Sequence, residues 1–277
     1  MKPPVHPPAT APVQCVELAL AGRPTRIEYA WVGNPDPAAP LMVFLHEGLG
    51  SLSMWRDFPA RLCAAIGFRG LVYSRPGYGQ STPRPATEAW TPRFMHDQAL
   101  TVLPALLAAL GIDTARTPPW LFGHSDGGSI ALLHAAHCPD KVAGLVVLAP
   151  HILVEDISVA SIELARQAYL NTDLKTRLAR HHADPDSAFW GWNDVWLSSA
   201  FRSWDIRAEL ATITCPVLAV QGLDDEYGTL AQIRGIQAQA PHTRLLELPA
   251  CGHSPHKDQP QAVIDAVGAF VARPPAG

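Results

Sequence analysis

One short segment of the chain has the residue types and spacing of a covalent catalyst. Residues 123–127 read Gly-His-Ser-Asp-Gly, so Ser125 stands two positions from a glycine on either side. The segment follows the apolar residues 119–122 and precedes a helix-like stretch. A serine on a sharp strand-to-helix turn needs small neighbours, and the helix that follows directs free N–H groups toward it. We therefore predict that Ser125 is a nucleophile. The alternative is a glycine-rich turn in which Ser125 caps the helix.

A serine hydroxyl is a weak nucleophile, so it needs a base that a third group orients. His253 is the predicted base, because it follows a glycine in the loop that leaves the last predicted strand. The nearby His256 is expected in a supporting role. The orienting acid should lie on the loop after the preceding strand, which offers Asp224, Asp225 and Glu226. Three adjacent acids are also typical of a solvated turn.

The order Ser125, Asp225, His253 resembles the Ser…Asp/Glu…His order of the α/β-hydrolase fold family. The resemblance covers about residues 14–272 and implies that Ser125 is the nucleophile and His253 the base. In that family the acid is commonly the third residue after the glycine that ends the strand. The resemblance therefore implies that Asp225 is the acid, in preference to Asp224.

The resemblance also implies an oxyanion hole made of two backbone N–H groups. One belongs to the residue after the nucleophile, Asp126. The other comes from the loop after the third strand, which reads His46-Glu47-Gly48 where the family usually has His-Gly. We predict Gly48 as this second donor, with Glu47 and Leu49 as the alternatives. A carboxylate beside an oxyanion hole is unfavourable unless it points away or holds a proton. Glu47 is therefore expected to be a structural anchor or a substrate contact.

The elements that must position these residues alternate between strand and helix patterns. Helix-like segments separate eight strand-like runs, and the later runs are continuously apolar. Such runs are typical of parallel strands that are buried on both faces. The pattern predicts an α/β protein with a mostly parallel eight-stranded sheet covered by helices on both faces. The strands are expected at 13–20, 26–31, 41–45, 70–73, 120–123, 142–149, 217–221 and 244–248, and the helices at 55–66, 94–110, 129–137, 230–240 and 261–272.

One stretch breaks this alternation. Residues 151–211 carry no strand signal and are helical in pattern at 158–169 and 173–181, before a Trp-rich piece at 188–204. We predict a helical cap at 151–211, inserted into a core formed by 14–150 and 212–273. The alternative is a helical excursion that only completes the core. Residues 1–13, with five prolines in the first twelve positions, are expected to form an extended tail.

The cap and the loop after the third strand are expected to contact the substrate. Aromatic side chains in the cap favour a small or medium apolar or aromatic ester or lactone, although these tryptophans are equally expected to pack the cap onto the core. His151 and Arg75 are candidates for binding a carboxylate of the substrate. A site of this kind would suit enol-lactones or ring-cleavage products, and in this the chain resembles the meta-cleavage-product hydrolases and the enol-lactonases. The predicted substrate-binding residues are His46, Glu47, His151, Trp190, Trp192 and Trp196.

These residues together predict a serine hydrolase that cleaves an ester or lactone through an acyl-enzyme on Ser125. There are two alternatives. One is a carbon–carbon bond hydrolase of ring-cleavage products that uses the same triad, and the other is a ligand receptor on the same fold with slow turnover. A dehalogenase or epoxide hydrolase of this family would be expected to carry Asp at position 125, so the serine disfavours both.

The composition of the 277 residues limits the partners. Hydrophobic residues make up 48% and charged residues only 17%, which favours a folded domain. The net charge of −4 without a basic block argues against nucleic acid, and no apolar run is long enough to span a membrane. Five scattered cysteines favour a cytoplasmic protein with free thiols. A small-molecule substrate is expected, with no metal or cofactor. The oligomeric state is open, and a homodimer is among the allowed states.

Overall fold

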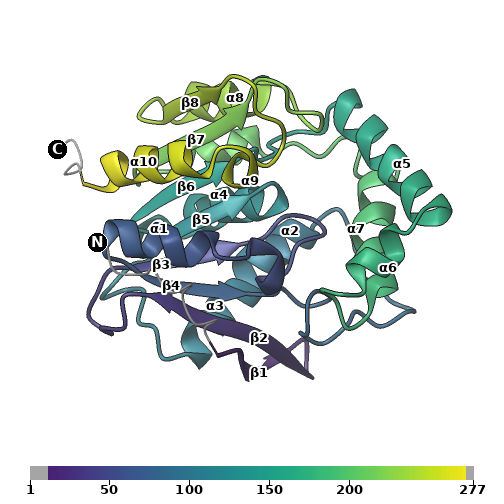
Figure 1. The fold of residues 1–277 in the computed structure, drawn as a ribbon, viewed down its shortest axis with the longest axis horizontal. Coiled ribbons are helices and arrows are strands. Elements are labelled where there is room, and N and C mark those ends of the chain that lie inside the picture. The colour runs from purple at the N-terminus through teal and green to yellow at the C-terminus, as the bar shows by residue number, and fades with distance from the viewer. Residues whose placement is uncertain (1–11, 273–277) are drawn as a thin grey trace, which may run out of the picture.

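An eight-stranded sheet lies at the centre of the molecule, with the strand order β1-β2-β4-β3-β5-β6-β7-β8 (Figure 1). The computed structural model describes residues 12–272, so residues 1–11 of the predicted tail lie outside the described residues. β2 pairs antiparallel with β1 and with β4, and the other neighbouring strands are parallel. The predicted mostly parallel eight-stranded sheet is confirmed. The strands are β1 (Gln14–Leu20), β2 (Arg23–Gly33), β3 (Leu41–Leu45), β4 (Arg69–Tyr73), β5 (Trp120–His124), β6 (Gly144–Leu148), β7 (Val217–Gly222) and β8 (Arg244–Leu248).

The burial of the strands follows their sequence patterns. β3 and β6 are apolar throughout and are almost completely covered on both faces, as expected for parallel strands between two layers of helices. β1 alternates, with Leu18 buried between exposed neighbours. β2 is longer than the predicted strand 26–31, because a two-residue turn at Ala21 and Gly22 pairs it with the whole of β1. Both turn residues have positive φ, which suits the twist of a tight hairpin.

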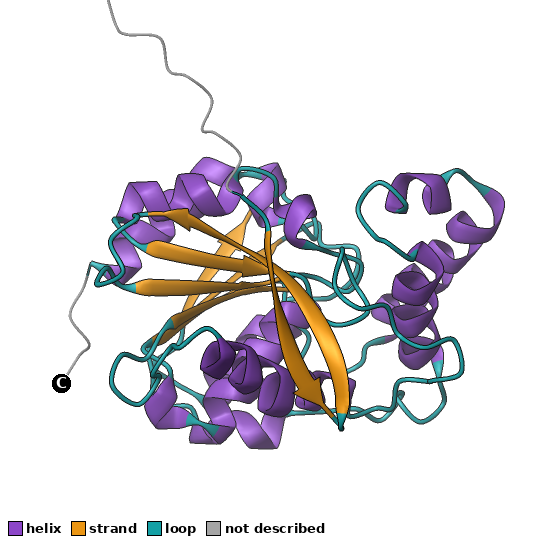
Figure 2. Cartoon of the chain, turned by 90° about the horizontal axis from the view of Figure 1, so that it is seen from below, coloured by secondary structure: helices purple, strands orange, loops and turns teal. Residues whose placement is uncertain are grey.

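Helices cover both faces of the sheet (Figure 2). Successive side chains of a strand point to opposite faces, so β3 supplies two separate apolar cores. Phe44 packs in the core beneath α1 (Phe58–Ile66) and α10 (Pro260–Val271), and Val43 packs in the core beneath α3 (Leu103–Ala109), α4 (Asp126–His137) and α8 (Ala231–Gln239). The core helices and short helical turns are η1 (Leu52–Trp55), α1 (Phe58–Ile66), α2 (Phe94–Asp97), η2 (Gln98–Val102), α3 (Leu103–Ala109), α4 (Asp126–His137), η3 (Pro139–Lys141), α8 (Ala231–Gln239), α9 (Pro255–Asp258) and α10 (Pro260–Val271).

The predicted helix 94–110 is divided into α2, the π-helical turn η2 and α3. Pro104 explains this division, because proline has no N–H group and its ring crowds the carbonyl group four residues earlier. The wider turn of η2, directly before α3, provides the space that the ring requires. The apolar periodicity predicted the helical segment but not the local change in its winding.

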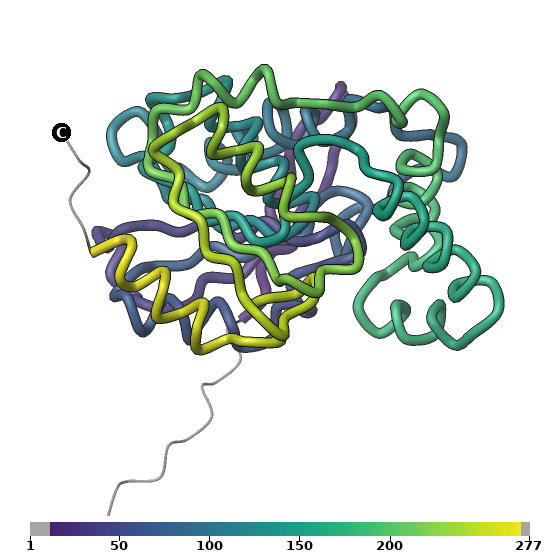
Figure 3. Tube along the Cα trace, turned by 90° about the horizontal axis from the view of Figure 1, so that it is seen from above, coloured from purple at the N-terminus to yellow at the C-terminus, as the bar shows by residue number. Residues whose placement is uncertain are grey.

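The predicted insertion connects β6 to β7 and is helical. It contains α5 (Asp156–Asn171), α6 (Leu174–Leu178), α7 (Pro185–Leu197) and the 3-10 turn η4 (Arg207–Thr212). α5, α6 and α7 stand together at one end of the sheet (Figures 1 and 3). A backbone bridge between Leu153 and Asp205 closes the base of this inserted helical segment. Among residues 12–272, no helix combines the length and the apolar character needed to cross a lipid bilayer.

The sequence marks the start of α7 clearly. The helix ends before the Trp-rich piece at 188–204 does. Asp184 is the N-cap residue, and its carboxylate accepts a hydrogen bond from the Ser187 N–H, while Pro185 takes the first helical position. The helix ends at Leu197, where Ser198 adopts an extended conformation. The tryptophans at 190, 192 and 196 therefore lie on one helix, whose rotation decides which of them faces the core.

Candidate active site

Ser125 occupies a strained turn between β5 and α4. Its φ of 53° and ψ of −121° lie outside the regions that L residues ordinarily adopt. Two glycines make this turn possible: a Cβ on Gly123 would overlap the Gly127 carbonyl, and a Cβ on Gly127 would overlap the Leu45 carbonyl. The turn has the strand-to-helix geometry of a nucleophile elbow. α4 starts three residues earlier than predicted, because glycines weaken a helical pattern.

Ser125, His253 and Asp225 form one hydrogen-bonded chain. The distance between Ser125 Oγ and His253 Nε2 is 3.0 Å, and the distance between His253 Nδ1 and Asp225 Oδ1 is 2.8 Å. The three residues follow β5, β8 and β7, parallel strands whose carboxyl ends meet at one edge of the sheet. In this arrangement an acid orients a histidine that can take the serine proton.

Asp225 is fixed by further donors. Its carboxylate accepts hydrogen bonds from Gln221 Nε2 at 3.0 Å and from the Tyr227 N–H at 2.9 Å. Burial raises the pKa of Asp225, but its hydrogen bond with His253 and the charge of that ring outweigh burial, so the pKa lies below its ordinary value. Asp225 is therefore ionised at neutral pH and can stabilise an imidazolium. The adjacent Asp224 is exposed and makes no hydrogen bond with His253.

The backbone of His253 is also held on both sides. Its N–H donates to Glu226 Oε2 at 3.1 Å, and its carbonyl accepts a hydrogen bond from His124 Nε2 at 2.7 Å. His124 directly precedes Ser125, so one chain segment carries the nucleophile and holds the loop of the base. Sequence reasoning missed this contact of His124. The only signal was a polar residue at the end of an otherwise apolar strand.

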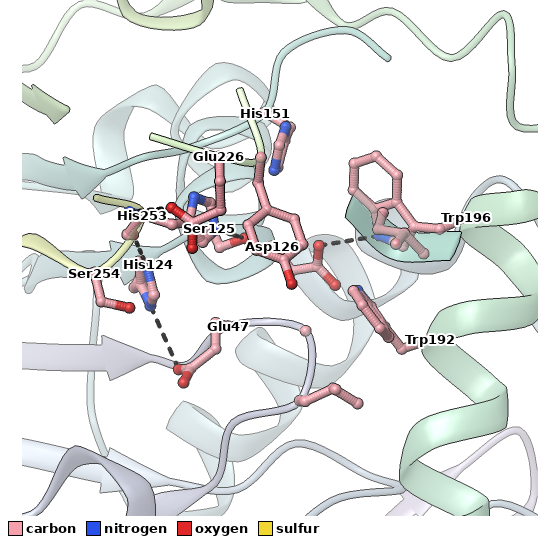
Figure 4. A pocket seen from close by; sticks show the side chains of 14 residues that line it. Glu47, His124, Ser125, Asp126, His151, Trp192, Trp196, Glu226, His253 and Ser254 are labelled. Atoms are coloured by element: carbon pink, nitrogen blue, oxygen red, sulfur yellow. Dashed lines mark hydrogen bonds and ion pairs between the residues drawn. The ribbon is translucent and has the colours of Figure 1, made fainter. Parts of the chain in front are cut away.

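Glu47 lies on the same side of the site as His124 and points away from Ser125 (Figure 4). Its Oε1 lies 3.2 Å from Lys257 Nζ, and its Oε2 lies 3.5 Å from His124 Nδ1. Burial raises the pKa of Glu47, but the charge of Lys257 and the contact with His124 outweigh it and hold the pKa well below its usual range. Glu47 is therefore an ionised anchor, although part of it also lines the cavity.

His256 lies beside this group but makes no hydrogen bond to the triad. Its ring is 4.7 Å from the His124 ring and 4.8 Å from the Trp55 ring, measured between centroids. Burial and the neighbouring charge of His124 lower the pKa of His256 well below its usual value. A neutral, buried ring in this place supports His124 by packing, which is consistent with the expected supporting role.

The two predicted oxyanion donors, Gly48 and Asp126, both line the cavity beside Ser125. A Cβ on Gly48 would overlap the indole nitrogen of Trp192, so the indole can rest on this loop only where the residue is glycine. The N–H of Asp126 is the first of α4, where a helix leaves its N–H groups without internal partners. The assignment of both groups as oxyanion donors stays a prediction.

The side chain of Asp126 is buried between a tryptophan and an arginine. Its Oδ1 accepts a hydrogen bond from Trp196 Nε1 at 3.2 Å, and its Oδ2 lies 3.9 Å from an Arg75 guanidinium nitrogen. Burial raises the pKa of Asp126 to about 6, against the opposing effects of Arg75 and Trp196. At pH 7 Asp126 is therefore mostly ionised, but a modest fall in pH would protonate it.

A cavity of about 190 Å³ opens beside Ser125. The lining of this cavity combines loops of the core with residues of α5 and α7. Four of the predicted substrate contacts belong to it: Glu47, His151, Trp192 and Trp196. Figure 4 shows the side chains that line it. The lining residues are Glu47, Gly48, Leu49, His124, Ser125, Asp126, His151, Ile162, Trp192, Trp196, Glu226, Tyr227, His253 and Ser254.

Tyr227 and Ile162 line the cavity although the sequence did not point to them. The Tyr227 ring lies 4.7 Å from the His253 ring, between centroids. Its position two residues after Asp225 was a usable signal, because the loop that carries the acid must pass close to the base. Ile162 had no comparable signal, since it comes from α5 and depends on how the inserted helical segment sits on the core.

Two predicted substrate contacts, His46 and Trp190, lie outside this lining. His46 is fully buried: its Nε2 accepts the Arg75 N–H at 3.0 Å, and its Nδ1 lies 2.7 Å from the Glu47 carbonyl. It therefore braces the loop after β3. Trp190 packs edge-on against Tyr169 and lines a separate cavity on the other side of α7.

The family model for the alpha/beta hydrolase family matches residues 42–266. The chain therefore belongs to the alpha/beta hydrolase family. Its relatives are named as hydrolases, esterases and lipases, and it is an enzyme of this family.

Individual relatives are distant. A Caulobacter protein provisionally named a carbamate hydrolase is 29% identical, covering 83% of this chain and 90% of its own. An esterase of Mycobacterium tuberculosis is 24% identical, covering 92% of this chain and 89% of its own. Among solved structures, the enol-lactonase of Burkholderia xenovorans matches with a TM-score of 0.70 at 24% identity, over 93% of this chain and all of that one. At this identity the structural match supports the fold alone.

Proposed function

We propose that the protein is a serine hydrolase that cleaves a small to medium carboxylic ester or lactone through an acyl-enzyme on Ser125. The observation that most strongly supports this is the hydrogen-bonded chain from Asp225 through His253 to Ser125, with distances of 2.8 and 3.0 Å. The strained backbone of Ser125 presents the hydroxyl at the start of α4, where it can reach a bound carbonyl carbon.

The reaction begins when His253 Nε2 takes the proton of Ser125 as the oxygen attacks the carbonyl carbon. The imidazolium that forms donates a proton to the leaving alkoxide, which departs as the alcohol. Water then attacks the acyl-enzyme, with His253 again accepting and returning the proton. Asp225 keeps the ring oriented and stabilises its positive charge, because its own carboxyl stays ionised.

The oxyanion that forms in each half of the reaction requires two hydrogen-bond donors. The N–H groups of Asp126 and Gly48 are assigned to this task, because both residues line the cavity beside the nucleophile. One such donor is worth roughly 100- to 1,000-fold in kcat in other serine hydrolases. The fixed loop positions of both residues keep these dipoles aligned before the substrate arrives.

The size and lining of the cavity support a small substrate under a helical cap. A volume of about 190 Å³ lies below the roughly 300–1,000 Å³ that is usual for drug-sized ligands. Ile162, Trp192 and Trp196 bring apolar surface from the inserted helical segment, residues 151–211, to within reach of the substrate. We assign this segment the role of a cap that excludes water while the acyl-enzyme forms.

The direct test is hydrolysis of p-nitrophenyl butyrate together with labelling of the protein by a fluorophosphonate. The wild-type enzyme should turn over many times, and it should lose activity once one equivalent of the fluorophosphonate is bound. The Ser125→Ala variant should lose both properties, whereas Ser199→Ala, on an exposed serine, should keep them. Turnover no faster than about one event in ten minutes would contradict the proposal and favour a ligand receptor with slow hydrolysis.

A further inference from the structure

The charged side chains that line the cavity are all acidic. Glu47, Asp126 and Glu226 contribute carboxylates to the lining, and no lysine or arginine belongs to it. The triad adds the carboxylate of Asp225 directly behind His253. A substrate that enters this cavity therefore meets carboxylates and histidine rings but no cationic group of the described residues.

Two cations lie behind these carboxylates and are already engaged. The Arg75 side chain is completely buried, donates a hydrogen bond to the Glu47 carbonyl and lies 3.9 Å from Asp126. Lys257 pairs with Glu47 at 3.2 Å. Four carboxylates thus stand against two cations around the cavity, and the carboxylates are the nearer groups. The earlier expectation that Arg75 binds a substrate carboxylate does not fit this position.

Three polar atoms of the lining residues have no hydrogen-bond partner within residues 12–272. One is Nδ1 of His124, which faces the Glu47 carboxylate at 3.5 Å, and the others are Oδ2 of Asp126 and Nδ1 of His151. Burial lowers the pKa of His151 to about 3, so this ring is neutral at pH 7 and cannot serve as a cation. The side chains of Asp126 and His151 are both at least nine-tenths buried. A buried acceptor without a partner is costly, which favours a ligand that brings a donor to it.

We propose that the active site selects uncharged or cationic substrates over anionic ones, and that Asp126 is the specificity-determining residue that accepts a hydrogen bond from a hydroxyl, amide or ammonium group of the substrate. This proposal rests on the proposed function of the same site and adds the substrate's charge class. It separates this chain from enzymes whose substrates carry carboxylates, such as ring-cleavage products.

The expected discrimination follows from the charges. An anionic group placed in the cavity would approach carboxylates that outnumber the cations behind them, and the repulsion is stronger where water screens it poorly. Three esters with six-carbon acyl chains measure the effect: p-nitrophenyl hexanoate, mono-p-nitrophenyl adipate and p-nitrophenyl 6-aminohexanoate, whose ammonium group can donate a hydrogen bond. The anionic ester should have a kcat/KM at least about tenfold below that of the neutral ester, and the cationic ester should equal or exceed the neutral one.

The Asp126→Asn variant tests the assigned residue, because the amide keeps the shape and an acceptor oxygen but removes the charge. The neutral-to-anionic ratio of kcat/KM should fall at least about threefold in this variant. Asp194→Asn is the matched control. It removes one carboxylate from the exposed side of α7, outside this cavity, and the ratio should keep its wild-type value.

Equal or faster hydrolysis of the anionic ester by the wild-type enzyme would overturn the proposal, as would an unchanged ratio in Asp126→Asn. A failure of the proposed function is distinguishable from both results. If no ester is hydrolysed, the proposed ester hydrolysis is contradicted. The charge preference is then read from calorimetric binding of the same esters to Ser125→Ala, where equal or tighter binding of the adipate ester would again overturn it.

Discussion

The two neighbours of Ser125 in the chain, His124 and Asp126, lie in contrasting regions. His124 points toward the base: it donates to the His253 carbonyl and contacts the Glu47 carboxylate. Asp126 points toward the substrate cavity, where it pairs with Trp196 and lies near Arg75. We call these the base side and the substrate side of the nucleophile.

Both sides contain a carboxylate and a cation, yet they differ in the distance between the two charges. On the base side Glu47 and Lys257 are 3.2 Å apart, and the pKa of Glu47 is held well below its usual range. On the substrate side Asp126 and Arg75 are 3.9 Å apart, and burial raises the pKa of Asp126 to about 6. A tightly paired carboxylate can anchor a loop, whereas a loosely paired one keeps the capacity to bind a ligand.

The largest effect is expected where the base side meets the triad. Asp225→Asn should lower kcat by about 1,000- to 10,000-fold, because the amide favours the wrong tautomer of His253. Asp224→Asn should stay within about threefold of wild type, since this neighbour is exposed and makes no hydrogen bond to the base. Steady-state kinetics with a p-nitrophenyl ester compare the two. A larger loss of kcat in Asp224→Asn than in Asp225→Asn would assign the role of the acid to Asp224 and would contradict the arrangement described for the base side.

The next effect concerns the charge on the substrate side. Because the pKa of Asp126 is raised, the folded protein binds more protons than the unfolded chain between about pH 4 and pH 6. Stability from this group is therefore present at low pH and is lost as the pH rises through 6. Asp126→Asn should match wild type near pH 4.5 and exceed its unfolding free energy by up to about 3 kcal/mol at pH 8. Urea denaturation at the two pH values measures this. A variant less stable than wild type at pH 8 would show that the Asp126–Arg75 pair is a net stabilising one.

A smaller effect is expected from the anchor on the base side. Glu47→Gln should lower kcat about tenfold for a neutral ester with little change in KM, because it loosens the hold of His124 on the His253 loop. Two substitutions at His124 test whether the effect passes through its hydrogen bond to the His253 carbonyl. His124→Gln retains an N–H donor and should keep more activity than His124→Leu. Equal losses in these two variants would argue that His124 only fills space.

The smallest effect distinguishes two tryptophans of α7. Trp192→Phe should raise KM about threefold, because its indole rests on Gly48 and lines the cavity. Trp190→Phe is the matched control, since Trp190 packs against Tyr169 on the other side of the helix. Michaelis kinetics that show the larger KM change at Trp190 would place the substrate in the second cavity.

The sequence predicted the sheet and the three residues that the structure brings into one hydrogen-bonded chain. Ser125 and Asp225 follow largely apolar, buried strands, whereas His253 follows the edge strand β8, which is only partly buried. For His253 the signal was the glycine before it in the loop that leaves the last strand. The start of α4 was missed because the glycines that permit the turn also weaken the helical pattern.

The substrate contacts were less predictable, because they depend on side-chain direction. Trp190 and Trp192 are two residues apart and lie on different sides of α7, which no composition argument distinguishes. His46 is next to a cavity residue in sequence but turns inward to brace Arg75. The Glu47 contacts join segments about 80 and 210 positions apart, to His124 and Lys257. Pairings over such separations become visible only in three dimensions.

In the proposed mechanism Ser125 carries the acyl group. Rapid-quench mass spectrometry of the enzyme with p-nitrophenyl butyrate tests it directly, by locating the added butyryl mass after proteolysis. We expect close to one butyryl group per molecule in the first turnover, on the peptide that contains Ser125, and none in Ser125→Ala. Butyryl on a different residue, or full turnover by Ser125→Ala, would contradict it.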